Sequence, residues 1–217
     1  MKKFELTNEF ITNMFGTKLF RIRALVEFGD VEAGELGGYV EKESNLGHDD
    51  NAWVYGDARV YDNALVYDNA RVYGDAQVSG DARVYDNARV YGDAWVYGDA
   101  RVYDNALVCG NARVYDNARV YGDAWVYGNA RVCGDALVCG DARVCGNGDY
   151  AYAHGFGSVN RTTTFFRLKD GGVGVRCGCF YGTLAQFRDK IRETHGETKK
   201  AQEYLMLADL MKLRFEK

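Results

Sequence analysis

Apolar and polar positions follow one six-residue period through the middle of the chain. From Ala52 to Asn147 the unit Ala-x-Val-Tyr-(Gly/Asp)-(Asp/Asn) occurs sixteen times without a break. In each unit Ala and Val are two residues apart and point to one side of a strand, while the residue between them and the Tyr point to the other side. The period does not match the 3.6-residue stripe of an α-helix, so it predicts short strands.

The last two positions of each unit predict a corner in the chain. They hold Gly-Asp, Asp-Asn or similar pairs, which tolerate left-handed backbone conformations. Three strands and three corners form a coil of eighteen residues, and stacked coils pair their strands in parallel about 4.8 Å apart. Residues 52–147 therefore predict a mainly β fold, a parallel β-helix of five to six coils with Ala and Val inside.

The units resemble the left-handed β-helix of hexapeptide-repeat proteins. That family has an aliphatic residue at position i and a small residue at i+4. Here Val54 precedes Ala58 and Val60 precedes Ala64, a pattern that continues through Val138. The resemblance implies a left-handed coil, since the period alone does not determine the hand.

Residues 1–51 are predicted to form an N-terminal β cap with degenerate first coils. The segment 18–24 alternates polar and apolar residues, which is typical of a strand, and the stretch 4–11 can pair with it across a turn at 13–16. Residues 34–40 then lead into the degenerate coils. A β-helix exposes unpaired strand edges at both ends, so caps prevent end-to-end growth.

Residues 148–217 are predicted to form a small ββαα module. The segments 162–168 and 173–180 are typical of a hairpin. A helix is expected from a capping box at Thr183, followed by a second helix over 198–215.

The flanks are similar to those of hexapeptide-repeat proteins from bacteria, prophages and phages, some of which are described as polymer-forming and cytoskeletal-like. The residues that carry this resemblance are Phe20–Leu25, Gly29–Val31, Gly34–Glu41, Cys177–Thr183 and Thr194–Gly196. The resemblance implies a phage or prophage accessory protein, a kind that often counters host defences.

Charge and composition narrow the class of partner and the compartment. The net charge is −4, without the basic excess typical of nucleic-acid binders, so nucleic acid is not the expected partner. No apolar run approaches the roughly 20 residues of a membrane span, and the first residues lack the apolar stretch of a secretory signal. We expect a cytoplasmic location in the host cell and no membrane contact.

The six cysteines predict free thiols. Four of them replace Tyr in outward positions, namely Cys109, Cys133, Cys139 and Cys145. Cys177 and Cys179 form a C-x-C on an expected strand, so both should face one way, but no further ligands lie nearby in the sequence. We expect no metal site and no cofactor, in a reducing compartment.

The histidines argue against catalysis. The best-known enzymes with this β-helix are acyltransferases with a His base at a seam between subunits, whereas His48, His154 and His195 all lie in the flanks here. We therefore expect no catalytic residues. An acyltransferase-like enzyme with a site at a subunit seam remains an alternative, and His154 would be its first candidate residue.

The outward positions provide the candidate binding residues. Residues eighteen apart should stack into ladders of Arg beside Tyr, and exposed Trp should lie on a second face; the candidates are Arg83, Arg101, Arg119, Tyr85, Tyr103, Tyr121, Trp53 and Trp125. Tyr, Trp and Arg are enriched at binding hot spots, but they also suit a solvated strand face, where Arg over Tyr adds a cation–π contact. The sequence thus predicts a non-enzymatic protein that docks on a host protein and modulates it, for example as a counter-defence inhibitor. The alternatives are the enzyme above and a self-assembling structural protein that forms homo-oligomers through its caps or faces.

Overall fold

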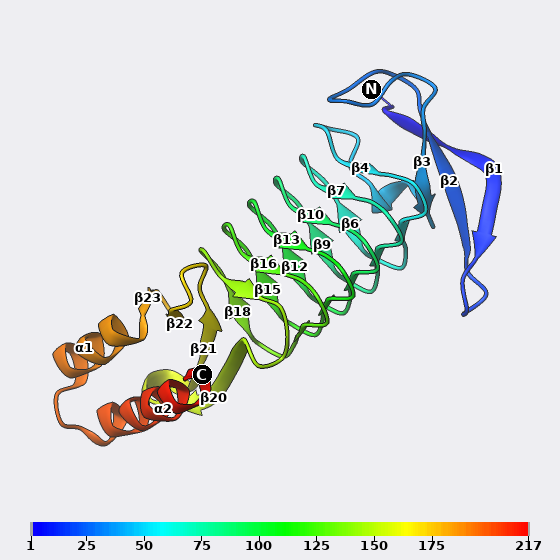
Figure 1. Ribbon diagram of the computed structural model, residues 1–217. Helices are drawn as coiled ribbons and strands as arrows, with labels where there is room; N and C mark the ends of the chain where they lie inside the picture. Colours follow the sequence, from blue (N-terminus) through cyan, green and yellow to red (C-terminus); the bar gives the residue numbers. More distant parts are fainter. Residues whose placement is uncertain (1, 217) are drawn as a thin grey trace.

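The repeat forms a row of stacked coils with a strand hairpin at one end and two helices at the other (Figure 1). In this computed structural model, which describes residues 2–216, the chain is a mainly β protein built on a parallel β-solenoid of about six turns. Each repeat strand pairs with the strand eighteen residues later, as Val54 does with Val72 and Val90 with Val108. The predicted fold class is confirmed, while the left hand of the coil stays a prediction.

Three sheets of two-residue strands make the sides of the solenoid. We name each side by its first repeat strand. The β4 face holds β4 (Trp53–Val54), β7 (Arg71–Val72), β10 (Arg89–Val90), β13 (Leu107–Val108), β16 (Trp125–Val126) and β19 (Arg143–Val144). The β5 face holds β5 (Arg59–Val60), β8 (Gln77–Val78), β11 (Trp95–Val96), β14 (Arg113–Val114) and β17 (Arg131–Val132). The β6 face holds β6 (Leu65–Val66), β9 (Arg83–Val84), β12 (Arg101–Val102), β15 (Arg119–Val120) and β18 (Leu137–Val138).

The core is the column of inward Ala and Val side chains. From Ala52 to Val144 every inward Ala and Val of the repeat is fully buried. The corners have the predicted left-handed conformation, for example at Asp86 (φ 55°) and Gly92 (φ 70°). Each added coil buries another set of inward Ala and Val side chains and so stabilises the stack, as expected for a quasi-one-dimensional repeat.

The first coil is irregular and contains β3 (Leu36–Val40) and a 3₁₀ turn, η1 (Glu43–Asn45). β3 pairs in parallel with β5, and Leu46 bridges to Val66. A Cβ atom at Gly37 would lie 2.6 Å from the carbonyl oxygen of Val54, so only glycine lets β3 approach the next coil this closely.

The N-terminal hairpin covers the first coil. β1 (Phe4–Thr12) and β2 (Lys18–Ala24) pair antiparallel, and β2 also pairs antiparallel with β3. The Lys3 ammonium is buried and donates to the carbonyl of Ala52 at 2.9 Å, and burial lowers the pKa of Lys3 to about 8.

The C-terminal module closes the other end with more strands than the predicted hairpin. β20 (Tyr150–Phe156), β21 (Arg161–Arg167), β22 (Val173–Cys177) and β23 (Phe180–Thr183) form an antiparallel sheet, with the turn η2 (Ser158–Asn160) between β20 and β21. β21 meets the last coil, where the amide of Leu137 donates to Thr164 Oγ1 at 2.9 Å.

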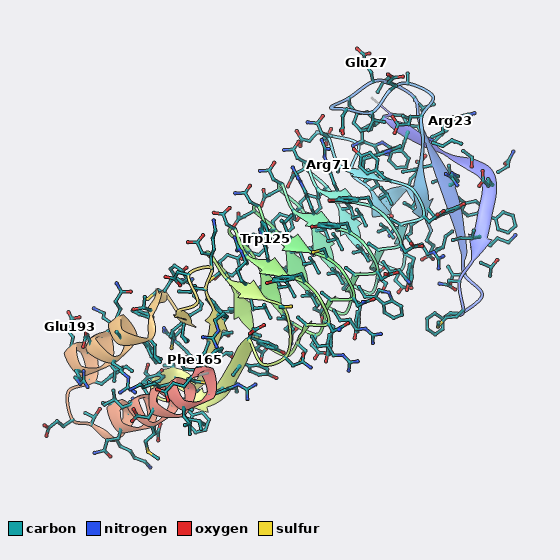
Figure 2. All side chains as sticks on the ribbon, viewed as in Figure 1. Arg23, Glu27, Arg71, Trp125, Phe165 and Glu193 are labelled. Carbon is teal, nitrogen blue, oxygen red and sulfur yellow. The ribbon has the colours of Figure 1, made fainter. Side chains whose placement is uncertain are left out.

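Two helices pack on this sheet. α1 (Leu184–His195) begins at the predicted capping box on Thr183, and α2 (Lys199–Phe215) follows. They enclose a second core around Phe165, which lies inside the module (Figure 2). No helix in residues 2–216 is long and apolar enough to cross a membrane.

The predicted common face of Cys177 and Cys179 is wrong. Gly178 takes a left-handed conformation (φ 57°) and reverses the chain between β22 and β23. Cys177 is therefore buried under the helices, while Cys179 is exposed in the turn.

Candidate functional site

The β6 face carries the two ladders that the repeat predicts. Parallel register places Arg83 beside Arg101 and Arg101 beside Arg119, and we call these three residues the arginine ladder. Their neighbours form the tyrosine ladder, which consists of Tyr67, Tyr85, Tyr103 and Tyr121. Both ladders occupy the positions of the repeat that alternate with the buried Ala and Val.

The tyrosine ladder is a continuous stack of rings. Consecutive ring centroids are 5.0 Å apart, and the planes differ by 1–3°. Burial of each ring by its neighbours raises the pKa of Tyr67, Tyr85 and Tyr103. Stacked aromatic pairs contribute about 0.5–1.5 kcal/mol each beyond area burial. The tyrosines therefore stabilise the coils by themselves and offer a partner mainly ring edges and hydroxyls.

The arginine ladder has no comparable internal role. Within residues 2–216 no acidic side chain lies within 4.0 Å of its guanidinium groups, and Arg83 and Arg119 are exposed. The neighbouring corner carboxylates are engaged elsewhere, since Asp86 accepts from the amide of Asp104 and Asp104 from that of Gly122. Like charges directly opposite each other in a sheet are destabilising.

Cation–π contacts form on the other two faces. Arg113 lies over Trp95 at 4.9 Å, and Arg143 lies over Trp125 at 4.3 Å. In the described chain no arginine of the β6 face lies over a tyrosine ring. The expected Arg-over-Tyr contact is thus absent from this face, so the arginine ladder lacks this stabilisation too.

The two candidate tryptophans do not join the ladders. Trp125 is 44% exposed, but it projects from the β4 face, as Arg71 does (Figure 2). Trp53 is fully buried, because Phe4 and Phe28 of the N-terminal cap pack edge-on against its ring. The prediction that Trp53 is an exposed binding residue is therefore wrong.

A groove of about 660 Å³ opens where the β6 face meets the C-terminal module. Arg119, the last residue of the arginine ladder, lines it together with Arg161 and His154. His154 Nδ1 lies 2.9 Å from Thr162 Oγ1 and 3.9 Å from Asp135 Oδ2. The groove thus extends the arginine ladder with a second exposed guanidinium.

Sequence reasoning missed Arg161, because nothing in its neighbourhood marks it. It reaches the groove through η2, where Val159 and Asn160 adopt positive φ angles of 52° and 49°. Such angles are rare outside glycine, especially for a β-branched residue. A positive-φ Val-Asn pair has no sequence signature, so this turn could not be predicted.

The histidines remain separate from one another. His48 stacks on Phe4 with centroids 4.5 Å apart, whereas His195 ends α1 beside Tyr204. Among the described residues no three His, Cys, Asp or Glu side chains are grouped closely enough to hold a metal ion.

The stacked coils and their three parallel sheets show that the chain is a repeat β-helix protein. The family described as YdcK beta solenoid repeat matches the chain six times, at residues 52–67, 65–80, 82–98, 94–110, 112–128 and 124–140. These matches fall within the repeat and agree with the solenoid. No curated protein matches the chain.

Proposed function

We propose that this chain is a non-enzymatic docking protein that binds another protein through the β6 face. The observation that carries the proposal is the arginine ladder, three arginines in register without an ion-pair partner in the described chain. Natural sequences break a local stability rule mainly at functional sites. A partner's carboxylates would neutralise the ladder through bidentate contacts, which are strong and directional.

The partner that fits is a protein with an acidic, flat surface. The face is built on a regular sheet and backed by stacked tyrosines, so little side-chain freedom is lost on binding. Arg161 and Arg119 continue the positive strip into the groove. We take the partner to be a host protein in the cytoplasm, which this chain would inhibit in a counter-defence role. The choice of a host protein rests on the resemblance of the flanks to phage and prophage proteins.

The test is capture of the partner from a lysate of the bacterium in which the gene occurs, using the tagged protein. The variant Arg83→Glu/Arg101→Glu/Arg119→Glu reverses the ladder. Its control is Arg89→Glu/Arg131→Glu, which reverses two exposed arginines on the β4 and β5 faces. We expect one stoichiometric protein that the control retains and the ladder variant loses, with affinity reduced at least about tenfold.

Two results would overturn the proposal. One is a partner that both variants retain, which would place docking on a cap or another face. The other is a His154→Ala variant that still captures the partner but no longer has the protein's effect in the host cell. That result would favour the enzyme alternative. Sedimentation of the purified protein over a range of concentrations separates docking from self-assembly, because self-assembly alone makes the mass rise.

A further inference from the structure

A small hollow lies in the C-terminal module. It measures about 200 Å³ and lies between α1, α2, η2 and the turn after β22. Its floor is formed by Phe180, Phe187, Ile191 and Tyr204. An apolar cavity of roughly 150 Å³ is known to accommodate benzene, so this hollow has room for one small ring.

The lining of the hollow contains the cationic side chains of Arg161 and Lys190, together with the imidazole of His195. None of the lining residues is Asp or Glu. Lys190 pairs with Glu193, which lies outside the hollow. Arg161 has no ion-pair partner in residues 2–216. Its guanidinium rests against Gly178, where a Cβ atom would lie 2.2 Å from Nη1.

The walls of the hollow are held in place before any ligand arrives. The Tyr204 hydroxyl accepts from the amide of Ser158 at 3.1 Å, and Glu203 accepts from the amide of Gly157 at 2.9 Å. The buried Cys177 thiol accepts from Thr163 Oγ1 at 3.1 Å. The contacts of Glu203 and Tyr204 hold the strained turn η2 against α2, while the Thr163–Cys177 bond joins β21 to β22. Strained backbone of this kind tends to cluster at ligand sites.

We propose that this hollow binds a small organic anion with one apolar ring and a single carboxylate. The ring would lie on the aromatic floor, and the carboxylate would meet Arg161 and His195 at the rim. An apolar site with a few convergent polar groups is the usual form of a small-molecule pocket. The volume is below the roughly 300–1,000 Å³ of pockets for drug-sized ligands, so the ligand has a single ring.

The experiment titrates the full-length protein with benzoate and, separately, with benzyl alcohol, a neutral molecule of similar size. Calorimetry and the chemical shifts of the Ile191 methyl groups report binding. We expect saturable 1:1 binding of benzoate with a Kd of roughly 1 mM or tighter. Benzyl alcohol should bind at least about fivefold more weakly, because it lacks the charge that Arg161 recognises.

Three variants locate the site. Thr194→Phe fills the mouth of the hollow from an exposed position and should abolish binding. Arg161→Gln should remove the preference for benzoate over benzyl alcohol. Arg192→Gln, an exposed residue of α1 that pairs with Asp189, is the matched control and should bind benzoate like the original protein.

The proposal is wrong if benzoate does not saturate, if both molecules bind equally, or if the folded Thr194→Phe variant still binds benzoate. This site is independent of protein docking. Arg161 also lines the groove beside the β6 face, so Thr194→Phe, which touches only the hollow, should leave the captured partner bound.

Discussion

Gly157 shows how a single hydrogen atom determines the arrangement of the C-terminal module. A Cβ atom at this position would lie 1.9 Å from Cζ of Tyr204, inside the ring edge. Gly155, two residues earlier, also has a positive φ, but no atom lies within 4 Å of its virtual Cβ. Both glycines have a positive φ, but only Gly157 has another side chain close beside it.

We expect Gly157→Ala to destabilise the protein more than Gly155→Ala. Both variants place alanine at a positive φ, which costs at least about 1–2 kcal/mol, and Gly157→Ala adds about 1–3 kcal/mol of overpacking against Tyr204. Urea unfolding monitored by tyrosine fluorescence measures the difference. Equal losses for the two variants would contradict the contact between Gly157 and the tyrosine ring.

Residue-scale predictions from the sequence succeeded where the cause was local. The corner positions take positive φ, as at Asp62 (58°) and Gly98 (69°), because Gly and Asp tolerate that conformation wherever they occur. Trp53 was misjudged because the residues that bury it, Phe4 and Phe28, come from a different part of the chain. A period describes how coils stack on each other, but not what covers the first coil.

At the scale of the strand, the two ladders of the β6 face separate structure from function. The tyrosine rings stack at 5.0 Å and support one another, whereas the arginines only repel. The helices show the same locality as the corners: the capping box at Thr183 begins α1 as predicted. The sequence does not predict the strands β20 and β23, because their own residues carry no clear strand pattern. They form strands by pairing antiparallel with β21 and β22.

The arginine ladder should therefore be dispensable for folding. We expect Arg101→Gln to leave the free energy of unfolding unchanged or to raise it by up to about 0.5 kcal/mol, since it relieves repulsion from Arg83 and Arg119. Arg113→Gln is the control on the β5 face, because Arg113 also lies beside an arginine, Arg131, but contacts Trp95 as well. It should be less stable than Arg101→Gln by about 0.5–1 kcal/mol, because it loses the contact with Trp95.

Urea unfolding at low and high salt tests this pair. Any gain from Arg101→Gln should shrink at high salt, where exposed charges are screened. A loss above about 1 kcal/mol for Arg101→Gln, as large as a typical destabilising mutation, would show that the arginines are structural and would remove the main support for docking.

At the scale of the whole molecule, the stacked tyrosines link stability to alkaline pH. Burial raises the pKa of Tyr55 to about 12 and also raises that of Tyr67, Tyr85 and Tyr103. In the unfolded chain tyrosine ionises near pH 10. Between these values the folded protein holds more protons than the unfolded chain, so stability falls as pH rises. Below about pH 10 this contribution is fully present.

Ionisation of Lys3 has the opposite effect on stability, over a lower range of pH. Its folded pKa of about 8 lies below the ordinary lysine value of 10.5. The unfolded chain therefore holds the extra proton between these values, and stability rises with pH. Above about 10.5 the Lys3 contribution no longer changes with pH, and ionised rings 5.0 Å apart would repel one another along the ladder. We expect the urea midpoint to hold or rise to about pH 10 and then to fall steeply toward pH 12.

The variant Tyr85→Phe/Tyr103→Phe/Tyr121→Phe isolates the ladder, because it keeps the stacked rings and removes their ionisable hydroxyls. Its midpoint should fall less steeply above pH 10.5 than that of the original protein, while Lys3→Met should flatten only the region below. Tyrosinate absorbance during the same titration should lag behind that of the urea-unfolded chain. A decline that begins well below pH 10, or a slope that the triple variant leaves unchanged, would show that the ladder does not control the alkaline transition.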